Sequence, residues 1–127
     1  MRAEGQAHID RIEAALALVR RSLDWDRAVR RLDELNARVE DPTLWDNPKR
    51  AEEVMRERRR LEAAIGTVNE ITREMADAVE FVELGEMEGD EAVVAEGLSS
   101  LKALADRAFE AAPFAHHLFR ALGIVPQ

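Results

Sequence analysis

The chain has 127 residues, enough for one domain with a hydrophobic core, and it contains no cysteine. The absence of cysteine excludes disulfides, thiolate metal sites and a cysteine nucleophile, and it fits a reducing compartment. The formal net charge of -8 disfavours generic DNA or RNA binding, because such binding usually needs a basic field that neutralises phosphates.

The amino end shows no export signal. Residues 1–10 carry Glu4, His8 and Asp10 where a secretory signal needs an apolar core, and no apolar run reaches transmembrane length. We therefore expect a cytoplasmic protein with no membrane partner. The composition is 46% hydrophobic and 35% charged with no tyrosine, which favours an elongated helical protein over a sheet protein.

Two helices are predicted in the first third of the chain, from about residue 2 to 22 and from about residue 26 to 40. Ser22 and Asp24 are candidate caps between them, and the join could be a tight turn or only a kink. Apolar residues of the first helix recur at spacings of three and four, which makes a narrow packing seam. They are Ile9, Ile12, Leu16, Val19 and Leu23.

Two prolines separate the second helix from the third. Asp41 should end the second helix because it precedes Pro42, and Asn47 should cap the third, with Pro48 at its first position. We expect Trp45, between the prolines, to close the end of the bundle. For this residue and for Trp25, a core position is favoured over a partner contact.

The long third helix is the most informative element. It is predicted from about Pro48 to Leu84, would be roughly 50 Å long, and must therefore pack against other helices over most of its length. One apolar row recurs every seventh position, and a second row is interrupted by Arg58 and Thr72. The first row is Val54, Leu61, Val68, Met75 and Val82, and the second is Ala51, Ile65 and Val79.

A loop from Gly85 to Gly89 is expected to lead to Asp90, the cap of a fourth helix over about residues 91–108. The fold class is therefore all-α: an elongated antiparallel bundle of three to four helices with coiled-coil-like packing. The fourth helix can pack back on the third through Val94, Leu98, Leu101, Ala105 and Ala108.

The chain changes character after residue 108. Three phenylalanines occur within eleven residues around Pro113, which breaks helical continuity. We interpret residues 1–108 as the helical domain and residues 109–127 as a divergent tail, in which residues 113–127 could either add a short helix ending at Gly123 or be poorly ordered.

Charge is unevenly distributed along the chain. Nine acidic residues and no lysine or arginine lie between Glu74 and Glu96, which we interpret as a solvated face rather than a site for a metal or a basic partner. A basic cluster lies around Arg58, which falls on a packing row and could either extend to solvent or set the helix register.

Spacing within the basic cluster favours an exposed salt-bridged face over a phosphate-contacting patch. Glu52 and Arg56 are four residues apart, and Glu57 and Arg60 are three apart, so both pairs can form along one helix.

The sequence shows no group of residues typical of an active site or a metal site. Two of the three histidines are adjacent and would point about 100° apart on a helix, so they cannot share a metal. Ser22, Ser99 and Ser100 lack the context of an activated nucleophile, and the Glu-x-x-His motif of di-metal bundles is absent. We expect no catalytic residue, no cofactor and no metal ligand, and therefore no enzyme. The histidines are His8, His116 and His117.

Four segments, in order and at natural spacing, resemble the amino-terminal helical domain of the bacterial peptide chain release factor 2 family, a class I release factor family. The resemblance covers Met1 to about Ala108, and its most specific element is Glu-Asp-Pro-x-Leu-Trp-x-x-Pro. The segments are Leu23-Asp24-Trp25-Asp26, Arg30-Arg31-Leu32-Asp33-Glu34-Leu35-Asn36, Glu40-Asp41-Pro42-Thr43-Leu44-Trp45-Asp46-Asn47-Pro48 and Val82-Glu83-Leu84-Gly85-Glu86-Met87-Glu88-Gly89-Asp90.

The resemblance implies a role in translation termination. Proteins of that family recognise stop codons on the ribosome and trigger hydrolysis of peptidyl-tRNA, and their helical first domain faces the stalk base of the large subunit. The family's Gly-Gly-Gln and Ser-Pro-Phe strings do not occur in this sequence, so the chain looks truncated before the decoding and catalytic domains.

We therefore expect a non-catalytic module that docks on the large-subunit factor-binding region of the ribosome or on a termination accessory factor. The alternative is a helical adaptor that forms a homodimer through its heptad row and has no ribosome role. An enzyme is the third and least favoured interpretation.

Overall fold

The computed structural model describes residues 1–111, and the predictions for residues 113–127 lie outside this range. Over these residues the chain is helical and contains no strand, so the predicted all-α class is confirmed. The elements are α1 (Ala3–Leu23), α2 (Trp25–Glu40), the 3₁₀ helix η1 (Pro42–Asp46), α3 (Pro48–Glu88) and α4 (Glu91–Glu110).

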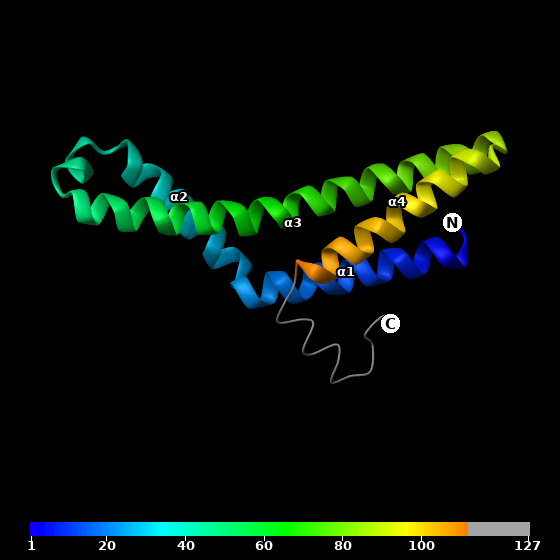
Figure 1. Ribbon diagram of the computed structural model, residues 1–127, viewed down its shortest axis with the longest axis horizontal. Coiled ribbons are helices and arrows are strands. Elements are labelled where there is room, and N and C mark those ends of the chain that lie inside the picture. The colour runs from blue at the N-terminus through cyan, green and yellow to red at the C-terminus, as the bar shows by residue number, and fades with distance from the viewer. Residues whose placement is uncertain (112–127) are drawn as a thin grey trace.

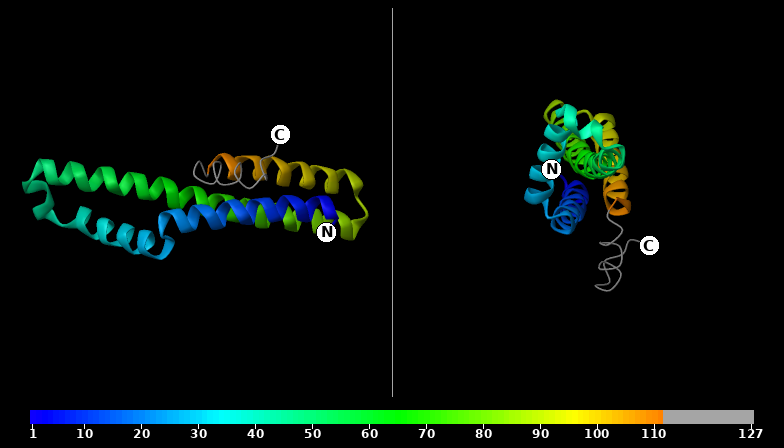
Figure 2. Two further views of the ribbon diagram at one scale, coloured as in Figure 1. Left: turned by 90° about the horizontal axis from the view of Figure 1, so that it is seen from below. Right: turned by 90° about the vertical axis from the view of Figure 1, so that its left-hand side faces the viewer.

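The helices form an elongated molecule (Figure 1). α1 and α2 follow one another toward one end, α3 returns along the whole length, and α4 folds back beside α3 and α1 (Figure 2). α1 and α4 are therefore parallel neighbours, and both are antiparallel to α3. The ion pair between Arg11 and Asp106, at 3.0 Å, joins α1 to α4 and lowers the pKa of the Asp106 carboxyl because Arg11 donates to it.

The join between α1 and α2 is a kink at a single residue. Asp24 adopts a left-handed conformation, with φ of 52°, and its amide donates to the carbonyls of Arg20 and Arg21. Its side chain caps neither helix, and Ser22 lies inside α1, so the predicted capping roles of Ser22 and Asp24 are wrong. Aspartate is one of the few residues that tolerate this backbone region, which explains how the chain bends here without glycine.

The proline-bounded connection begins and ends as predicted. Asp41 accepts a hydrogen bond from the Thr43 amide at 3.0 Å, and Asn47 accepts one from the Arg50 amide at 3.2 Å to start α3. Trp45, however, is 53% exposed, so the expectation that it closes the bundle is wrong. Successive side chains in a 3₁₀ turn diverge by about 120°, so only one neighbour of a pair can face the bundle, and here that neighbour is the half-buried Leu44.

The hairpin between α3 and α4 is tighter than predicted. α3 does not end at Leu84 but continues through Gly85 to Glu88, and the left-handed Gly89, with φ of 68°, ends it. Asp90 then caps α4 as predicted, accepting from the Val93 amide at 3.2 Å.

Gly85 is therefore a packing residue rather than a loop residue. A Cβ atom at this position would lie 2.8 Å from Cγ1 of Val93 and 3.0 Å from the amide nitrogen of Val94. The absence of a side chain allows α3 and α4 to approach closely near the turn.

The main core lies where α1, α3 and α4 meet, and Trp25 packs at its edge as expected. The heptad row is buried at Val54, Val68 and Val82, whereas Leu61 and Met75 are only partly buried. Within residues 1–111, no helix combines the length and apolar character needed to cross a membrane. The cluster comprises Ile12, Ala15, Leu16, Val68, Ile71, Val82, Val94, Leu98, Leu101, Leu104, Ala105 and Ala108.

Candidate functional site

The two ends of the molecule differ in charge. Residues 25–60 contain ten basic and nine acidic residues, whereas residues 61–110 contain three basic and thirteen acidic residues. Because α2 pairs with the first half of α3, the first set forms one end of the molecule, which we call the basic arm (residues 25–60) (Figure 1). The acidic tip (residues 74–96) comprises the end of α3, the turn and the start of α4 at the opposite end.

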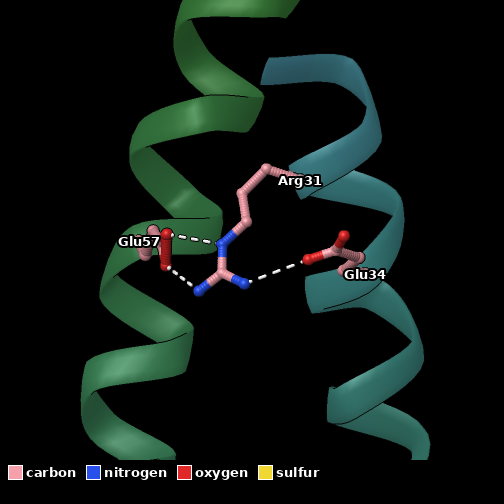
Figure 3. Close-up of polar contacts among 3 residues, drawn as sticks. All are labelled: Arg31, Glu34 and Glu57. Carbon is pink, nitrogen blue, oxygen red and sulfur yellow. Dashed lines mark hydrogen bonds and ion pairs between the residues drawn. The ribbon is translucent and has the colours of Figure 1, made fainter. Parts of the chain in front are cut away.

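An arginine fork joins the two helices of the basic arm. Arg31 donates from Nε and Nη2 to the two carboxylate oxygens of Glu57, at 2.8 and 2.9 Å, and from Nη1 to Glu34 at 3.1 Å (Figure 3). These bonds hold the pKa of Glu57 below its ordinary value and raise the pKa of Arg31. The predicted Glu57–Arg60 pair is not formed, because the Glu57 carboxylate is held by α2 instead.

Arg58 also links α2 to α3. It is partly buried, its Nε donates to Oδ1 of Asn36 at 2.7 Å, and its Nη2 lies 3.2 Å from Glu62. This cross-helix bond is what a register-setting residue would make. Along α3, the predicted Glu52–Arg56 pair is confirmed at 2.9 Å.

An open groove of about 770 Å³ runs along the basic arm and is lined in part by Arg27, Arg30 and Arg60. Within residues 1–111 these three arginines make no ion pair, unlike Arg31 beside them. The basic arm therefore combines fixed cross-helix pairs with free cations that could meet anionic groups of a partner.

The acidic tip is mostly solvated, as predicted. Three of its nine carboxylates form ion pairs within the described chain: Glu74 with Arg107, Glu86 with the amino terminus, and Glu91 with Arg2. No cluster of residues in the described part of the chain could hold a metal ion.

A stripe of large apolar residues crosses the acidic tip. Phe81, Leu84 and Met87 are 37%, 47% and 83% exposed, and we call them the tip stripe. Sequence reasoning did not select them, although a signal was available: they recur every third residue outside the heptad row and alternate with carboxylates.

A groove of about 540 Å³ between α3 and α4 adjoins the tip stripe. Phe81 belongs to both features, because it lines this groove as well as starting the stripe. Ala78, Ala103 and Leu104 provide the other apolar walls. The charged residues that line the groove are Glu74, Asp77, Glu96 and Arg107, and Arg107 is ion-paired with Glu74 at 2.8 Å.

The candidate reactive residues do not converge in the described chain. Ser22 is exposed on α1, and Ser99 and Ser100 are exposed on α4. His8 is partly buried 3.9 Å from Glu4, and its two ring nitrogens make no hydrogen bond within residues 1–111. His116 and His117 lie outside the described residues.

Comparison with known proteins identifies the family. The family model described as the PCRF domain matches residues 28–119. Peptide chain release factor 2 of Caulobacter sp. (strain K31) is 55% identical over 85 residues, which are 67% of this chain and 23% of that protein. The peptide chain release factor 2 proteins of Roseobacter denitrificans and Paramagnetospirillum magneticum are 49% and 46% identical over 108 residues, which are 85% of this chain and 29% of each protein.

The resemblance to release factors drawn from the sequence motifs is therefore confirmed. The chain spans only 23% to 29% of the length of these curated relatives. Since the family model covers most of the chain, we conclude that this chain belongs to the PCRF domain family.

Proposed function

We propose that this chain is a non-catalytic helical module of translation termination in the cytoplasm. It docks on the large-subunit factor-binding region of the ribosome or on a termination accessory factor. The observation that carries the proposal is the 49% identity over 108 residues to a protein named peptide chain release factor 2. In this proposal residues 1–108 form the docking domain and residues 109–127 form an appended tail.

The shape and surface of the bundle support a docking role. Its interior is apolar, one end is strongly acidic whereas the other has nearly balanced charge, and its helices are held together by cross-helix pairs such as Arg31–Glu57. Hydrolysis of an ester requires donors that are positioned to orient water and to stabilise developing charge. The described residues offer surfaces for contact rather than such a constellation.

Co-sedimentation with purified ribosomes tests the proposal directly. We expect the chain to pellet with ribosomes at micromolar concentration and to be displaced by an intact release factor 2. Absence of any association under these conditions would refute the docking role. In a peptidyl-tRNA hydrolysis assay we expect no release above the buffer rate, and hydrolysis by the isolated chain would refute the non-catalytic assignment.

A homodimeric adaptor is the rival function. The exposed tip stripe favours it, whereas the heptad row of α3 is largely occupied by α1, α2 and α4 within one chain. Sedimentation equilibrium separates the two proposals. A mass of 14.3 kDa at high concentration supports the docking module, and twice that mass supports the adaptor.

A further inference from the structure

We propose that the acidic tip binds a basic amphipathic helix of a protein partner. The apolar side chains of that helix lie along the tip stripe and the adjoining groove, and its lysines and arginines face the surrounding carboxylates. This inference rests on the proposed docking function and assigns the surface and the partner chemistry through which docking occurs.

The tip stripe has the geometry of a helix-binding surface. Phe81, Leu84 and Met87 are spaced by three residues, so each side chain neighbours the next along the surface of α3. The buried Val82 and Gly85 face the rest of the bundle. Leu84 and Met87 therefore lie on a face of α3 that α1 and α4 leave exposed, whereas Phe81 lies at the border with α4, where its Cδ1 would be 3.3 Å from a Cβ on Gly97.

The groove extends this apolar surface toward α4. Phe81 joins the two features, and the small side chains of Ala78 and Ala103 line the groove beside Leu104. Small residues allow another helix to approach closely, while the larger apolar residues provide contact area. Helix-in-groove recognition uses such an arrangement, with anchors on the bound helix at spacings of three and four.

The charge around the stripe identifies the partner as basic. Asp77, Glu80, Glu83 and Glu88 alternate with the stripe residues, and within residues 1–111 they form no ion pair. A helix bearing lysine or arginine beside its apolar face would complement them and would associate faster at low salt. RNA phosphates would be repelled by the same carboxylates.

A second copy of this chain fits the surface less well. Its cations lie mainly on the basic arm, but the apolar residues of α2 there are turned largely toward α3: Ala28 and Leu35 are buried, and Val29, Leu32 and Val39 are partly buried. Within the described residues, α2 therefore has little exposed apolar surface to place on the tip stripe.

Ribosome co-sedimentation of matched variants tests the assignment. The tip variant combines Leu84→Ser and Met87→Ser, and the control variant is Trp45→Ser, which changes an exposed aromatic residue at the opposite end. We expect the tip variant to weaken ribosome binding by about tenfold or more, as for loss of central anchors, and the control to bind like the parent. Circular dichroism should show the same helix content in all three proteins.

A peptide-binding experiment tests the partner chemistry without the ribosome. The probe is an amphipathic Leu/Lys peptide of about 18 residues, or five helical turns, and its control is a scrambled peptide of the same composition. In amide NMR spectra we expect the probe to shift signals of residues 77–88, and the scrambled peptide to bind about tenfold more weakly.

The outcomes separate this inference from the docking function. If the parent and the tip variant bind ribosomes equally, the tip assignment is wrong and docking stands. If the parent does not bind ribosomes but the probe maps to the tip, docking is wrong and the surface assignment stands. Equal binding of the scrambled peptide, shifts confined to the basic arm, stronger binding of an RNA hairpin, or dimerisation lost in the tip variant would each overturn the inference.

Discussion

Gly85→Ala should destabilise the protein although it replaces glycine inside a helix. Alanine is favoured over glycine in a helix interior by about 1 kcal/mol. Against this, the new Cβ would lie 2.8 Å from Cγ1 of Val93 and 3.0 Å from both Cγ2 and the amide nitrogen of Val94. Overpacking of this kind costs about 1 to 3 kcal/mol.

The Val94 amide decides the sign of the effect. A side chain could rotate away from the new methyl group, but a backbone nitrogen in the first turn of α4 moves only if the helix moves. We therefore expect the cost to exceed the propensity gain and the free energy of unfolding to fall by about 1 kcal/mol.

Gly66→Ala is the matched control. Gly66 is exposed inside α3, and a Cβ there would meet nothing within 4 Å, so only the propensity term remains. This variant should gain about 1 kcal/mol. Calorimetry or thermal circular dichroism should show Tm shifts of about 4 °C in opposite directions for the two variants. An increase in Tm for Gly85→Ala equal to that for Gly66→Ala would refute the close approach of α3 and α4.

Three further predictions concern ion pairing, core packing and the connection. Arg31→Ala should cost about 0.5 to 1 kcal/mol at pH 7, because solvent screens this partly exposed pair. Since the pKa of Glu57 is lowered in the folded state, this stabilisation is present above its ordinary value of 4.5 and is lost as pH falls through the folded-state pKa. Urea unfolding at pH 7 and pH 3 should show the difference from the parent shrinking in acid, and an equal difference at both pH values would contradict the assignment. Leu101→Ala, at a fully buried position, should lower the free energy of unfolding by about 2 to 5 kcal/mol. Leu61→Ala, at a partly exposed position, should lower it by less than about 2 kcal/mol. The reverse order of urea midpoints would show that the core is misplaced. Trp45→Ala should change the unfolding free energy by less than about 0.5 kcal/mol in the same assay, because the ring is exposed, and a larger loss would place it in the core.

Local signals predicted most of the helix boundaries correctly. Asn47 with Pro48 and Asp90 before α4 act through side-chain and backbone groups within a few residues, so their effect can be read from short segments. Trp45 shows the limit of this reasoning. Its apolar ring suggested burial, but its orientation depends on which way the 3₁₀ turn faces the bundle.

The candidate surface could be predicted only in part from the sequence. The acidic run was evident as a composition shift, and the exposure of its carboxylates was predicted correctly, whereas the sequence alone did not favour a basic partner at this face. The tip stripe was not predicted, because the third helix was expected to end at Leu84 and Met87 was placed in the following loop, so Phe81, Leu84 and Met87 were not read as one helix face.

Helical periodicity, proline positions and capping residues by themselves determined that this chain is a set of long helices, because these effects act between residues close in sequence. Only the tertiary structure decided how the helices are arranged. It placed α1 parallel to α4, made Gly85 a contact between helices rather than a loop, and left one face of the acidic tip uncovered. Those features depend on how closely two backbones approach and on which faces remain unpartnered, and both follow from contacts between residues far apart in the chain.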